Sequence, residues 1–240
     1  MNWLQKLFNL DKVEALQKEC KVWQEMYQQS LLDIKVLNQA IEKLHSSNPK
    51  EDETNNKYPK SDVTYVRQEK DGVYEIDVRN YIDEYDSSIP SLGANNDDDT
   101  ALNCLVWVIN NIKYIPDKTQ YGIQEFWAYS YQTLRRKAGD CEDGAILLYN
   151  IMLKSGIPYW KIRLTAGNTP YGGHAYVTYY EESQDRWVSL DWCYFPTKLP
   201  IKDRVNYKED KLYGDVWFSW NKKYAFALQG TKLQISHGKK

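Results

Sequence analysis

The sequence lacks the segments that would place it in or across a membrane. A bilayer span takes about 20 consecutive apolar residues, and no run of that length is present. The first ten residues are too few and too often polar to form the apolar core of a signal peptide. Cysteine is scarce as well, with four in 240 residues, and scattered cysteines without an export signal favour reduced thiols. We therefore expect a cytoplasmic protein that has no membrane partner.

Basic character and metal-binding patterns are also missing. The chain has 31 Lys and Arg against 33 Asp and Glu, so no basic surface for nucleic acid is expected. It contains neither a Cys-x-x-Cys pair nor His-Glu-x-x-His, the spacings of common zinc sites. The acidic run at residues 95–99 lacks the spacing of a calcium loop and precedes a predicted helix, whose N-terminal end favours carboxylates. The sequence therefore predicts no nucleic-acid partner, no metal and no other cofactor.

The most informative segment that is present is Gly-Asp-Cys-Glu-Asp at residues 139–143. Asp140 is placed to be a helix N-cap with Asp143 at the third helical position, and apolar residues follow at helical spacing until Gly156. Cys141 would therefore lie in the first turn of a helix. In that position the helix dipole and unpaired backbone N–H groups favour thiolate over thiol. The segment predicts a nucleophilic cysteine.

A base and an orienting acid are expected on a hairpin downstream. Residues 172–180 and 186–192 are rich in aromatic and β-branched side chains, which is typical of strands, and a polar stretch separates them. If the turn centres between positions 182 and 183, His174 lies directly opposite Asp191. Directly paired residues share one face of the sheet within a few ångströms. The hairpin therefore predicts an imidazole held by a carboxylate.

The other histidines and cysteines offer no competing site. His45 falls in the polar end of a predicted helix and His237 in the tail, which leaves His174 as the base. Cys104 lies in an apolar helical segment and, like Cys193, is expected to be a small buried hydrophobe.

Cys141, His174 and Asp191 together have the residue types of a thiol acyl-transfer triad. The cysteine would be the nucleophile, the histidine the general base and acid, and the aspartate the group that orients the imidazole. The same residue types also bind zinc, so a zinc site assembled from these three side chains is the alternative. The polar setting of the cysteine favours catalysis over an inert thiol.

These motifs, in this order, resemble the transglutaminase-like superfamily. The resemblance rests on Gly-x-Cys-x-Asp before a helix, then His-Ala-aromatic-Val, then Leu-Asp after a Trp-Val run. Upstream, Phe126-Trp127 and the Gln-Thr-Leu at 132–134 are similar to the bacterial and viral branch, in which Pro and Glu usually stand at the places of Ser130 and Gln132. The similar segment covers roughly residues 100–195, under half of the chain.

The resemblance implies a papain-like α+β fold, in which the cysteine helix packs on an antiparallel sheet that carries the histidine and the aspartate. It also implies acyl transfer on a protein or peptide amide, with Cys141, His174 and Asp191 as the catalytic residues. Transfer of the thioester to water would make a peptidase or amidase, and transfer to an amine would make a protein-glutamine crosslinking enzyme. A non-catalytic structural or assembly protein, for example a phage virion component, is the alternative, because a fold does not fix a function.

The N-terminal part has a different pattern. From Asp11 and Glu14, which form a capping-box pattern, apolar residues recur at strict three-four spacing, and this predicts a coiled coil that forms a homo-oligomer or docks on a partner. Trp23 and Tyr27 are bulky for a parallel dimer, so the stoichiometry stays open. A single long helix that folds back on the following domain is the alternative. The repeat consists of Val13, Leu16, Cys20, Trp23, Tyr27, Ser30, Ile34, Leu37, Ile41 and Leu44.

Composition divides the chain into four parts. These are the helix at 1–45, a polar linker at 46–61, the catalytic domain at 62–235 and a tail at 236–240. The linker is rich in charged and amide side chains, which cannot form a packed core. The domain is expected to begin with a hairpin whose turn is Lys-Asp-Gly at 70–72.

Overall fold

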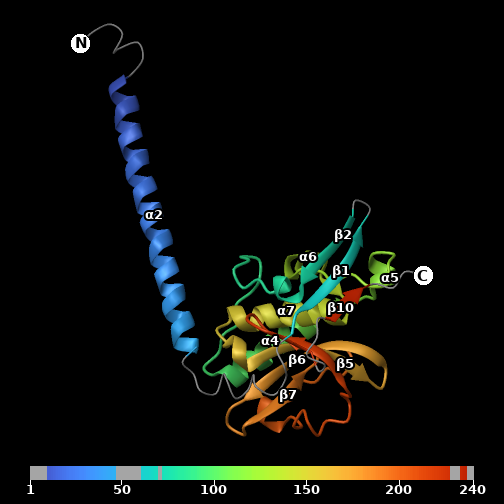
Figure 1. Cartoon of the computed structure of the whole chain (residues 1–240). Helices are drawn as coiled ribbons and strands as arrows, with labels where there is room; N and C mark the ends of the chain where they lie inside the picture. Colours follow the sequence, from blue (N-terminus) through green and yellow to red (C-terminus); the bar gives the residue numbers. More distant parts are fainter. Residues whose placement is uncertain (1–9, 47–60, 70–71, 228–232, 237–240) are drawn as a thin grey trace. The chain divides into compact units, whose positions relative to one another are not determined.

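The computed structural model describes residues 10–46, 61–69, 72–227 and 233–236 (Figure 1). The chain divides into two compact units, residues 1–54 and 55–240. The first unit contains one described helix, α2, and the second contains the described strands and the other described helices. The predicted linker at 46–61 and the predicted tail at 236–240 lie almost entirely outside the described residues.

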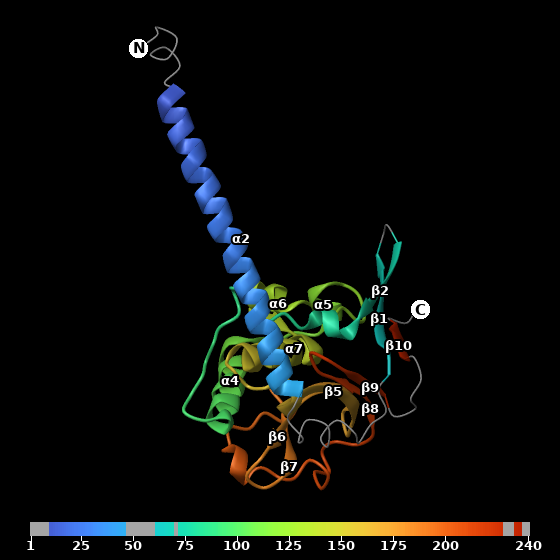
Figure 2. The same ribbon diagram turned by 60° about the vertical axis from the view of Figure 1, so that its left-hand side comes forward.

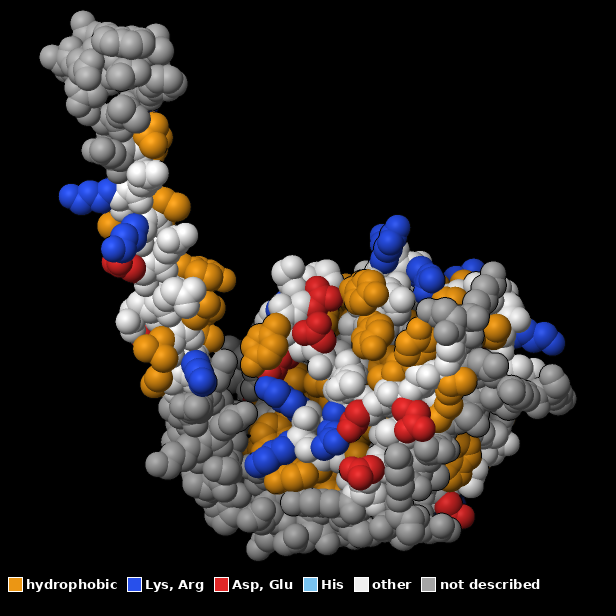
Figure 3. All heavy atoms as spheres, turned by 45° about the horizontal axis from the view of Figure 1, so that its top comes forward, with side chains coloured by type: hydrophobic (Ala, Val, Ile, Leu, Met, Phe, Trp, Pro, Cys, Tyr) orange, Lys and Arg blue, Asp and Glu red, His pale blue; other side chains and the backbone are white. Residues whose placement is uncertain are grey.

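The long N-terminal helix that the sequence predicts is confirmed. Helix α2 spans Leu10–Ser46, 37 residues, and its described apolar side chains are exposed, with 68% of Trp23 and 63% of Tyr27 accessible. Figure 3 shows such apolar side chains along much of the described part of the helix. The side chains of Ile41 and Leu44 lie outside the described ones. Pairing with other helices is untested, so the coiled coil stays a prediction.

An antiparallel sheet of five strands forms the centre of the second unit, in the order β7-β6-β5-β8-β9 (Figure 2). The strands are β5 Ile162–Thr169, β6 Gly172–Glu181, β7 Arg186–Leu190, β8 Val216–Trp220 and β9 Ala225–Ala227. Side chains alternate between the two faces of such a sheet. Leu164 pairs with Val177, which pairs with Leu190, and this face is apolar. Arg163 pairs with Thr178 on the other face, which is polar although it is buried.

Helix α7, Cys141–Lys154, packs its apolar side chains with the apolar face of this sheet in one core. It lies between the sheet and helix α6, Ser130–Arg136, in both ribbon views (Figures 1 and 2). The helix ends at Lys154, and Ser155 is its C-cap residue. Gly156 follows with a φ of 96°, in the left-handed region that glycine adopts without strain. The α+β fold with the cysteine helix on an antiparallel sheet is therefore confirmed.

Helix α4, Asp97–Asn111, also packs on α7. The Asn96 side chain accepts a hydrogen bond from the backbone N–H of Asp99 at 2.8 Å, so the acidic run starts a helix as predicted. No helix in the described part of the chain combines the length and the apolar character that a membrane span requires.

A three-stranded sheet in the order β10-β1-β2 stands beside the core. Strands β1 and β2 pair antiparallel, which confirms the predicted hairpin, and β10 pairs parallel with β1. A short parallel pair, β3 with β4, leads the chain into α7. The remaining elements are β1 Val63–Glu69, β2 Gly72–Asp77, η1 Val78–Tyr81, β3 Lys113–Tyr114, α5 Asp117–Gln120, β4 Ala138–Gly139, η2 Tyr159–Lys161, η3 Ile201–Asp203 and β10 Leu233–Ser236.

The predicted register of the β6–β7 hairpin is wrong by two positions. Glu181 pairs with Arg186, so the turn centres one residue later than expected, and Asp191 follows the end of β7 instead of lying opposite His174. An ion pair of 2.7 Å between Glu181 and Arg186 closes the ladder there, and Asp185 in the turn has a φ of 49°. Because side chains alternate with a period of two, a shift of two positions leaves every side chain on its predicted face.

Candidate active site

Cys141 is the first residue of α7, where β4 turns into the helix. A Cβ on Gly139 would come within 2.5 Å of the Asp143 side chain, so a glycine is needed for this close passage. Asp140 is the N-cap residue, but its side chain makes no capping hydrogen bond, contrary to the prediction. Asp143 instead accepts a hydrogen bond of 2.7 Å from the backbone N–H of Ala128. Neither contact is the predicted capping hydrogen bond; Asp143 instead links the start of α7 to the segment that contains Ala128.

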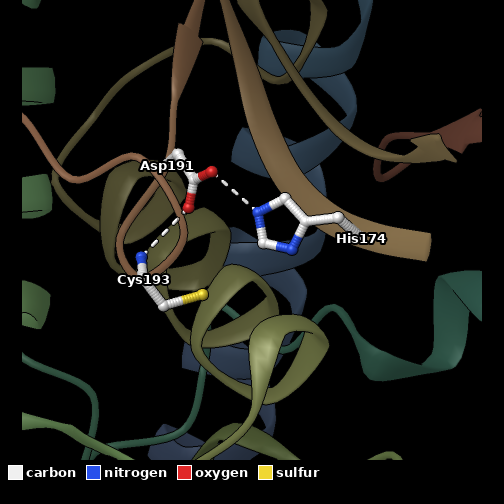
Figure 4. A group of neighbouring side chains, drawn as sticks. All are labelled: His174, Asp191 and Cys193. Carbon is white, nitrogen blue, oxygen red and sulfur yellow. Dashed lines mark hydrogen bonds and ion pairs between the residues drawn. The ribbon is translucent and has the colours of Figure 1, made fainter. Parts of the chain in front are cut away.

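The predicted base and acid are in direct contact. His174 on β6 and Asp191 after β7 are 2% and 1% exposed, and 2.7 Å separates His174 Nε2 from Asp191 Oδ2 (Figure 4). The imidazole lies parallel to the Tyr194 ring, with centroids 3.9 Å apart and an interplanar angle of 2°. Its second nitrogen, Nδ1, is buried and has no hydrogen-bond partner among the described residues. The geometry therefore leaves Nδ1 as the basic atom of the ring.

Asp191 is held by five hydrogen bonds. Its two side-chain donors are His174 and the Tyr213 hydroxyl, which lies 3.2 Å from Oδ2. The three backbone donors are the N–H groups of residues 193–195, at 3.0 to 3.3 Å. The carboxylate is thereby fixed in position and aimed at the imidazole.

The predicted zinc site of Cys141, His174 and Asp191 stays a prediction. In the structure the histidine and the aspartate converge with Cys193 instead, and one potential ligand atom of each lies within 4.8 Å of the others. A metal would have to displace the donors that already occupy both oxygens of Asp191. Cys193 is half-buried beside the site, not the fully buried hydrophobe expected from the sequence, and its N–H points to Asp191 (Figure 4).

The Cys141 thiol lies next to the strand that carries His174. The backbone of Ala175, the residue after His174 on β6, is close enough to the thiol to lower its pKa. The thiol itself donates to Glu142 Oε2 at 3.2 Å. The Trp192 indole N–H donates to the Cys141 carbonyl at 3.1 Å. The structure therefore brings the helix start and the β6–β7 hairpin together, as the three predicted site residues require.

The resting thiol differs from the sequence expectation. Burial, and after it the charge of Asp140, raise the pKa of the Cys141 thiol. Burial outweighs the helix dipole, so the thiol keeps its proton in this state. A base close to the sulfur is therefore needed before the cysteine can attack a carbonyl.

An acidic cluster that the sequence did not reveal surrounds the start of α7. Asp117 and Glu125 join the three acids of the cysteine motif, and one oxygen each of Asp117, Asp140, Glu142 and Asp143 is buried without a hydrogen-bond partner in the described part of the chain. Burial raises the pKa of Asp117 to about 8. Burial and mutual repulsion also raise the pKa values of Glu142 and Asp143 well above their ordinary range.

This cluster has the donor set of a hard cation. Calcium takes carboxylate oxygens as ligands, and one oxygen each of Asp117, Asp140 and Asp143 lies within 4.8 Å of the others. Asp117 opens helix α5 and is distant in sequence from the motif, so no local pattern joins it to Asp140. The only sequence signal is the density of acids around Cys141 itself.

Comparison with known proteins decides the family. The family model described as a transglutaminase-like domain matches residues 86–211, more than half of the chain. The chain belongs to this family. The predicted resemblance is therefore confirmed, and the matched segment contains Cys141, His174 and Asp191.

Solved structures with low identity to the transglutaminase-like domain were also found. Calcium-bound LapG of Legionella pneumophila is 17% identical, with 59% of this chain and 75% of that chain covered and a TM-score of 0.48. A Cytophaga hutchinsonii protein described as a candidate cysteine protease is 19% identical, with coverages of 54% and 45% and a TM-score of 0.30. A Parabacteroides distasonis protein described as a candidate protease is 16% identical, with coverages of 59% and 26% and a TM-score of 0.32. No curated protein matches the sequence.

Two departures from the usual motif of the transglutaminase-like branch have structural roles here. Gln132 accepts a hydrogen bond of 2.9 Å from the backbone N–H of Tyr129, which starts helix α6. The Ser130 hydroxyl accepts a hydrogen bond of 2.7 Å from Asn150 of α7. Both residues therefore fix α6 against the helix that carries the cysteine.

Proposed function

We propose that the transglutaminase-like domain catalyses thiol-dependent acyl transfer on amide bonds of a protein or peptide. Cys141 is the nucleophile, His174 the general base and acid, and Asp191 the residue that orients the imidazole. The buried contact between His174 and Asp191 is the observation that supports this proposal most directly. It holds Nε2 and leaves Nδ1 unpaired, and β6, the strand of His174, runs close to the Cys141 thiol. The family supports the chemistry by resemblance.

The first half of the reaction forms a thioester. Asp191 accepts a hydrogen bond from the N–H at Nε2, which keeps that proton in place and leaves Nδ1 with a lone pair. Nδ1 takes the thiol proton of Cys141 as the sulfur attacks the amide carbonyl. The C–N bond then breaks, and the imidazolium returns the proton to the leaving amine.

The second half releases the acyl group. Nδ1 takes a proton from water or from an acceptor amine, whose oxygen or nitrogen attacks the thioester carbonyl. The C–S bond breaks, and the proton passes to the sulfur to restore the thiol. In both halves the backbone N–H of Cys141, at the N-terminus of α7, stabilises the oxyanion.

Alkylation with iodoacetamide tests this proposal without a known substrate. We expect Cys141 to be modified, as identified by mass spectrometry, and His174→Ala to slow the modification at neutral pH. Cys20, which is exposed on α2, is the internal control and keeps its rate in both proteins. Equal Cys141 rates with and without the imidazole would contradict the assigned base, and amide turnover that survives both Cys141→Ala and His174→Ala would contradict the mechanism.

A role in assembly is the second candidate, and exposed apolar side chains on α2 favour it. We propose that α2 forms a coiled coil with copies of itself. Ile34 on the predicted seam is 54% exposed and Val36 off the seam is 55% exposed, so they form a matched pair. Ile34→Asp should lower the mass of the full chain measured by light scattering, and Val36→Asp should not. A monomeric wild-type chain at high concentration excludes self-association.

We also propose that the acidic cluster binds a divalent cation, which the sequence did not predict. The proposal rests on the buried unpartnered oxygens of Asp117, Asp140 and Asp143. Isothermal titration of calcium into the EGTA-treated full chain should show binding, and Asp117→Asn should weaken it. Magnesium, which prefers tight octahedral geometry and keeps its waters, should bind more weakly. Absence of both calcium heat and thermal stabilisation would rule the cation out.

A further inference from the structure

Four aromatic side chains form a row of ring contacts beside the proposed triad. Tyr194 lies parallel to the His174 imidazole, with ring centroids 3.9 Å apart. From Tyr194 the contacts continue to Tyr114, at 6.1 Å between centroids, and to Tyr171, at 6.3 Å. Phe195 stacks on Tyr171 at 5.5 Å. We call Tyr114, Tyr171, Tyr194 and Phe195 the aromatic shelf, and it begins on the ring of the proposed base.

The aromatic shelf also borders the nucleophile. The Tyr114 ring centroid lies 6.1 Å from that of Trp192, whose indole N–H donates to the Cys141 carbonyl at 3.1 Å. Burial, and after it the neighbouring Tyr194 hydroxyl and a charge on Cys141, raise the pKa of the Tyr114 hydroxyl. The shelf therefore touches both ends of the proposed catalytic pair. An amide that meets the sulfur and the His174 imidazole has its neighbouring groups within reach of these rings.

Much of the aromatic shelf is open to solvent. Tyr171 is 74% exposed and Tyr114 39%, and Tyr194 and Phe195 are half-buried. A group of exposed apolar side chains beside a catalytic centre is typical of a surface on which a ligand packs. None of the four side chains carries a charge, so the shelf offers ring faces and apolar area to a ligand and no ion pair.

The turn between β5 and β6 presents the most exposed ring in a fixed position. The Thr169 hydroxyl donates to the Gly172 carbonyl at 2.9 Å and accepts from the Tyr171 backbone N–H at 3.2 Å. Gly172 has a φ of 115°, which glycine adopts without strain. These contacts hold the backbone of Tyr171 although its side chain lies in solvent. The turn is therefore built to display the ring.

Asp191 holds the other part of the aromatic shelf. The backbone N–H groups of Tyr194 and Phe195 donate to its carboxylate at 3.2 and 3.3 Å. Behind Phe195 lies the edge of the Tyr213 ring, with centroids 5.7 Å apart, and Tyr213 in turn lines a cavity of about 310 Å³ on the polar face of the five-stranded sheet. The carboxylate that orients the imidazole thus also fixes two rings of the shelf. A surface that is formed in advance costs a ligand little ordering.

We propose that the aromatic shelf is a specificity site that binds an aromatic side chain next to the reacting amide. Tilted, offset and edge-on ring pairs with centroids about 4.5–7 Å apart are favourable beyond the area that they bury. The shelf rings already have such spacings among themselves, and a substrate ring on the exposed surface of Tyr171 extends the row by one member. This assignment rests on the proposed function and names its class of substrate.

Alkylating amides of graded shape test the aromatic shelf without a known substrate. N-benzyl-iodoacetamide carries a ring next to its amide, N-cyclohexylmethyl-iodoacetamide has a similar size without the π-system, and iodoacetamide has neither. The rate at Cys141 of the full chain is divided by the rate with free N-acetylcysteine, which removes intrinsic reactivity. The benzyl reagent should exceed iodoacetamide about tenfold, and the cyclohexylmethyl reagent should gain less. The proposal fails if the benzyl reagent gains nothing over iodoacetamide, or no more than the cyclohexylmethyl reagent.

Matched variants localise the effect. Tyr171→Ser removes the most exposed ring of the shelf, and Tyr85→Ser removes a ring of nearly equal exposure, 73% against 74%, that contacts Lys222 instead. Tyr171→Ser should lower the ratio of the benzyl rate to the iodoacetamide rate about threefold or more and raise the half-saturating concentration of the benzyl reagent. Tyr171→Phe, which keeps the ring, and Tyr85→Ser should keep the ratio. An unchanged ratio in Tyr171→Ser, or an equal loss in Tyr85→Ser, overturns the shelf.

The aromatic shelf and the proposed function fail in different ways. Alkylation of Cys141 that does not depend on His174 contradicts the proposed base, whereas the ratio between the reagents still decides whether the shelf binds a ring. A ratio of one in a chain whose alkylation slows in His174→Ala contradicts the shelf and leaves the proposed base in place.

Discussion

Helices α4 and α7 both have acidic residues in their first turn, but these residues are paired or exposed in α4 and buried in α7. Helix α4 starts with Asp97, Asp98 and Asp99, and these acids have partners or solvent: Lys161 Nζ lies 2.6 Å from Asp97 and the Tyr179 hydroxyl 2.6 Å from Asp98. Helix α7 also has acids in its first turn, but they are buried around a cysteine. Acidic residues at a helix start therefore stabilise the helix when they are exposed or paired, and they form a candidate binding site when they are buried together.

The two helices also carry matched cysteines. Cys104 of α4 is fully buried in the hydrophobic core, and burial raises its pKa to about 11. Cys141 of α7 is half-buried and lies beside the strand of His174. The same side chain is inert in one helix and, under the proposed function, a nucleophile in the other, because only one has a base and a route to solvent.

The largest expected effect separates these cysteines. Cys141→Ala should abolish amide turnover, and His174→Ala should reduce it by about 10² to 10⁴, the usual contribution of a general base. Cys104→Ala should leave turnover unchanged and lower only the free energy of unfolding. Turnover assays with a peptide-amide library and chemical denaturation provide the two measurements. Turnover that depends on Cys104 would reverse the comparison.

The next effect compares two carboxyl groups. Asp191→Asn should slow Cys141 alkylation at least tenfold, since an amide no longer fixes the proton on His174 Nε2. Asp98→Asn in α4 changes a carboxyl that accepts one hydrogen bond from a tyrosine, and it should leave the alkylation rate unchanged. Circular dichroism should show both variants folded. Equal rates for both variants would contradict the orienting role.

A smaller effect concerns cation binding. At calcium concentrations about 100 times the Kd, binding should stabilise the wild-type chain by about 2.7 kcal/mol. Asp143→Asn should lose most of this stabilisation, whereas Asp99→Asn, at the exposed start of α4, should keep it. Thermal melts with and without EGTA measure the difference. If both variants lost the calcium-dependent stabilisation equally, the proposed cation site at the start of α7 would be contradicted.

The smallest effect is local. Asn96→Ala removes the side-chain cap of α4 and should lower the free energy of unfolding by about 1 kcal/mol. It should not alter Cys141 alkylation, because α4 contributes no proposed site residue. Urea denaturation and mass spectrometry check the two parts. A slower alkylation in this variant would mean that the stability of α4 is coupled to the site.

Elements near the site were predictable because local patterns encode them. The apolar spacing after Cys141 and the glycine at position 156 predict α7 and its end, and the aromatic and β-branched composition of residues 172–180 predicts the strand that carries His174. The register of the β6–β7 hairpin was not predictable, since a φ of 49° at Asp185 and one ion pair moved the turn by one residue. Because the register shifted by two positions, Asp191 stayed on the same face of the sheet as His174, and the predicted contact formed despite this error.

The sequence by itself determined the helix that begins at Cys141, the strands β6 and β7, the long helix α2 and the family, because these depend on residues close together in the chain. Only the tertiary structure decided that Asp117 joins the acids around the cysteine, that burial raises the pKa of the thiol, and that a cavity lies on the polar face of the sheet. Burial and convergence depend on segments far apart in sequence, and no local pattern reports them.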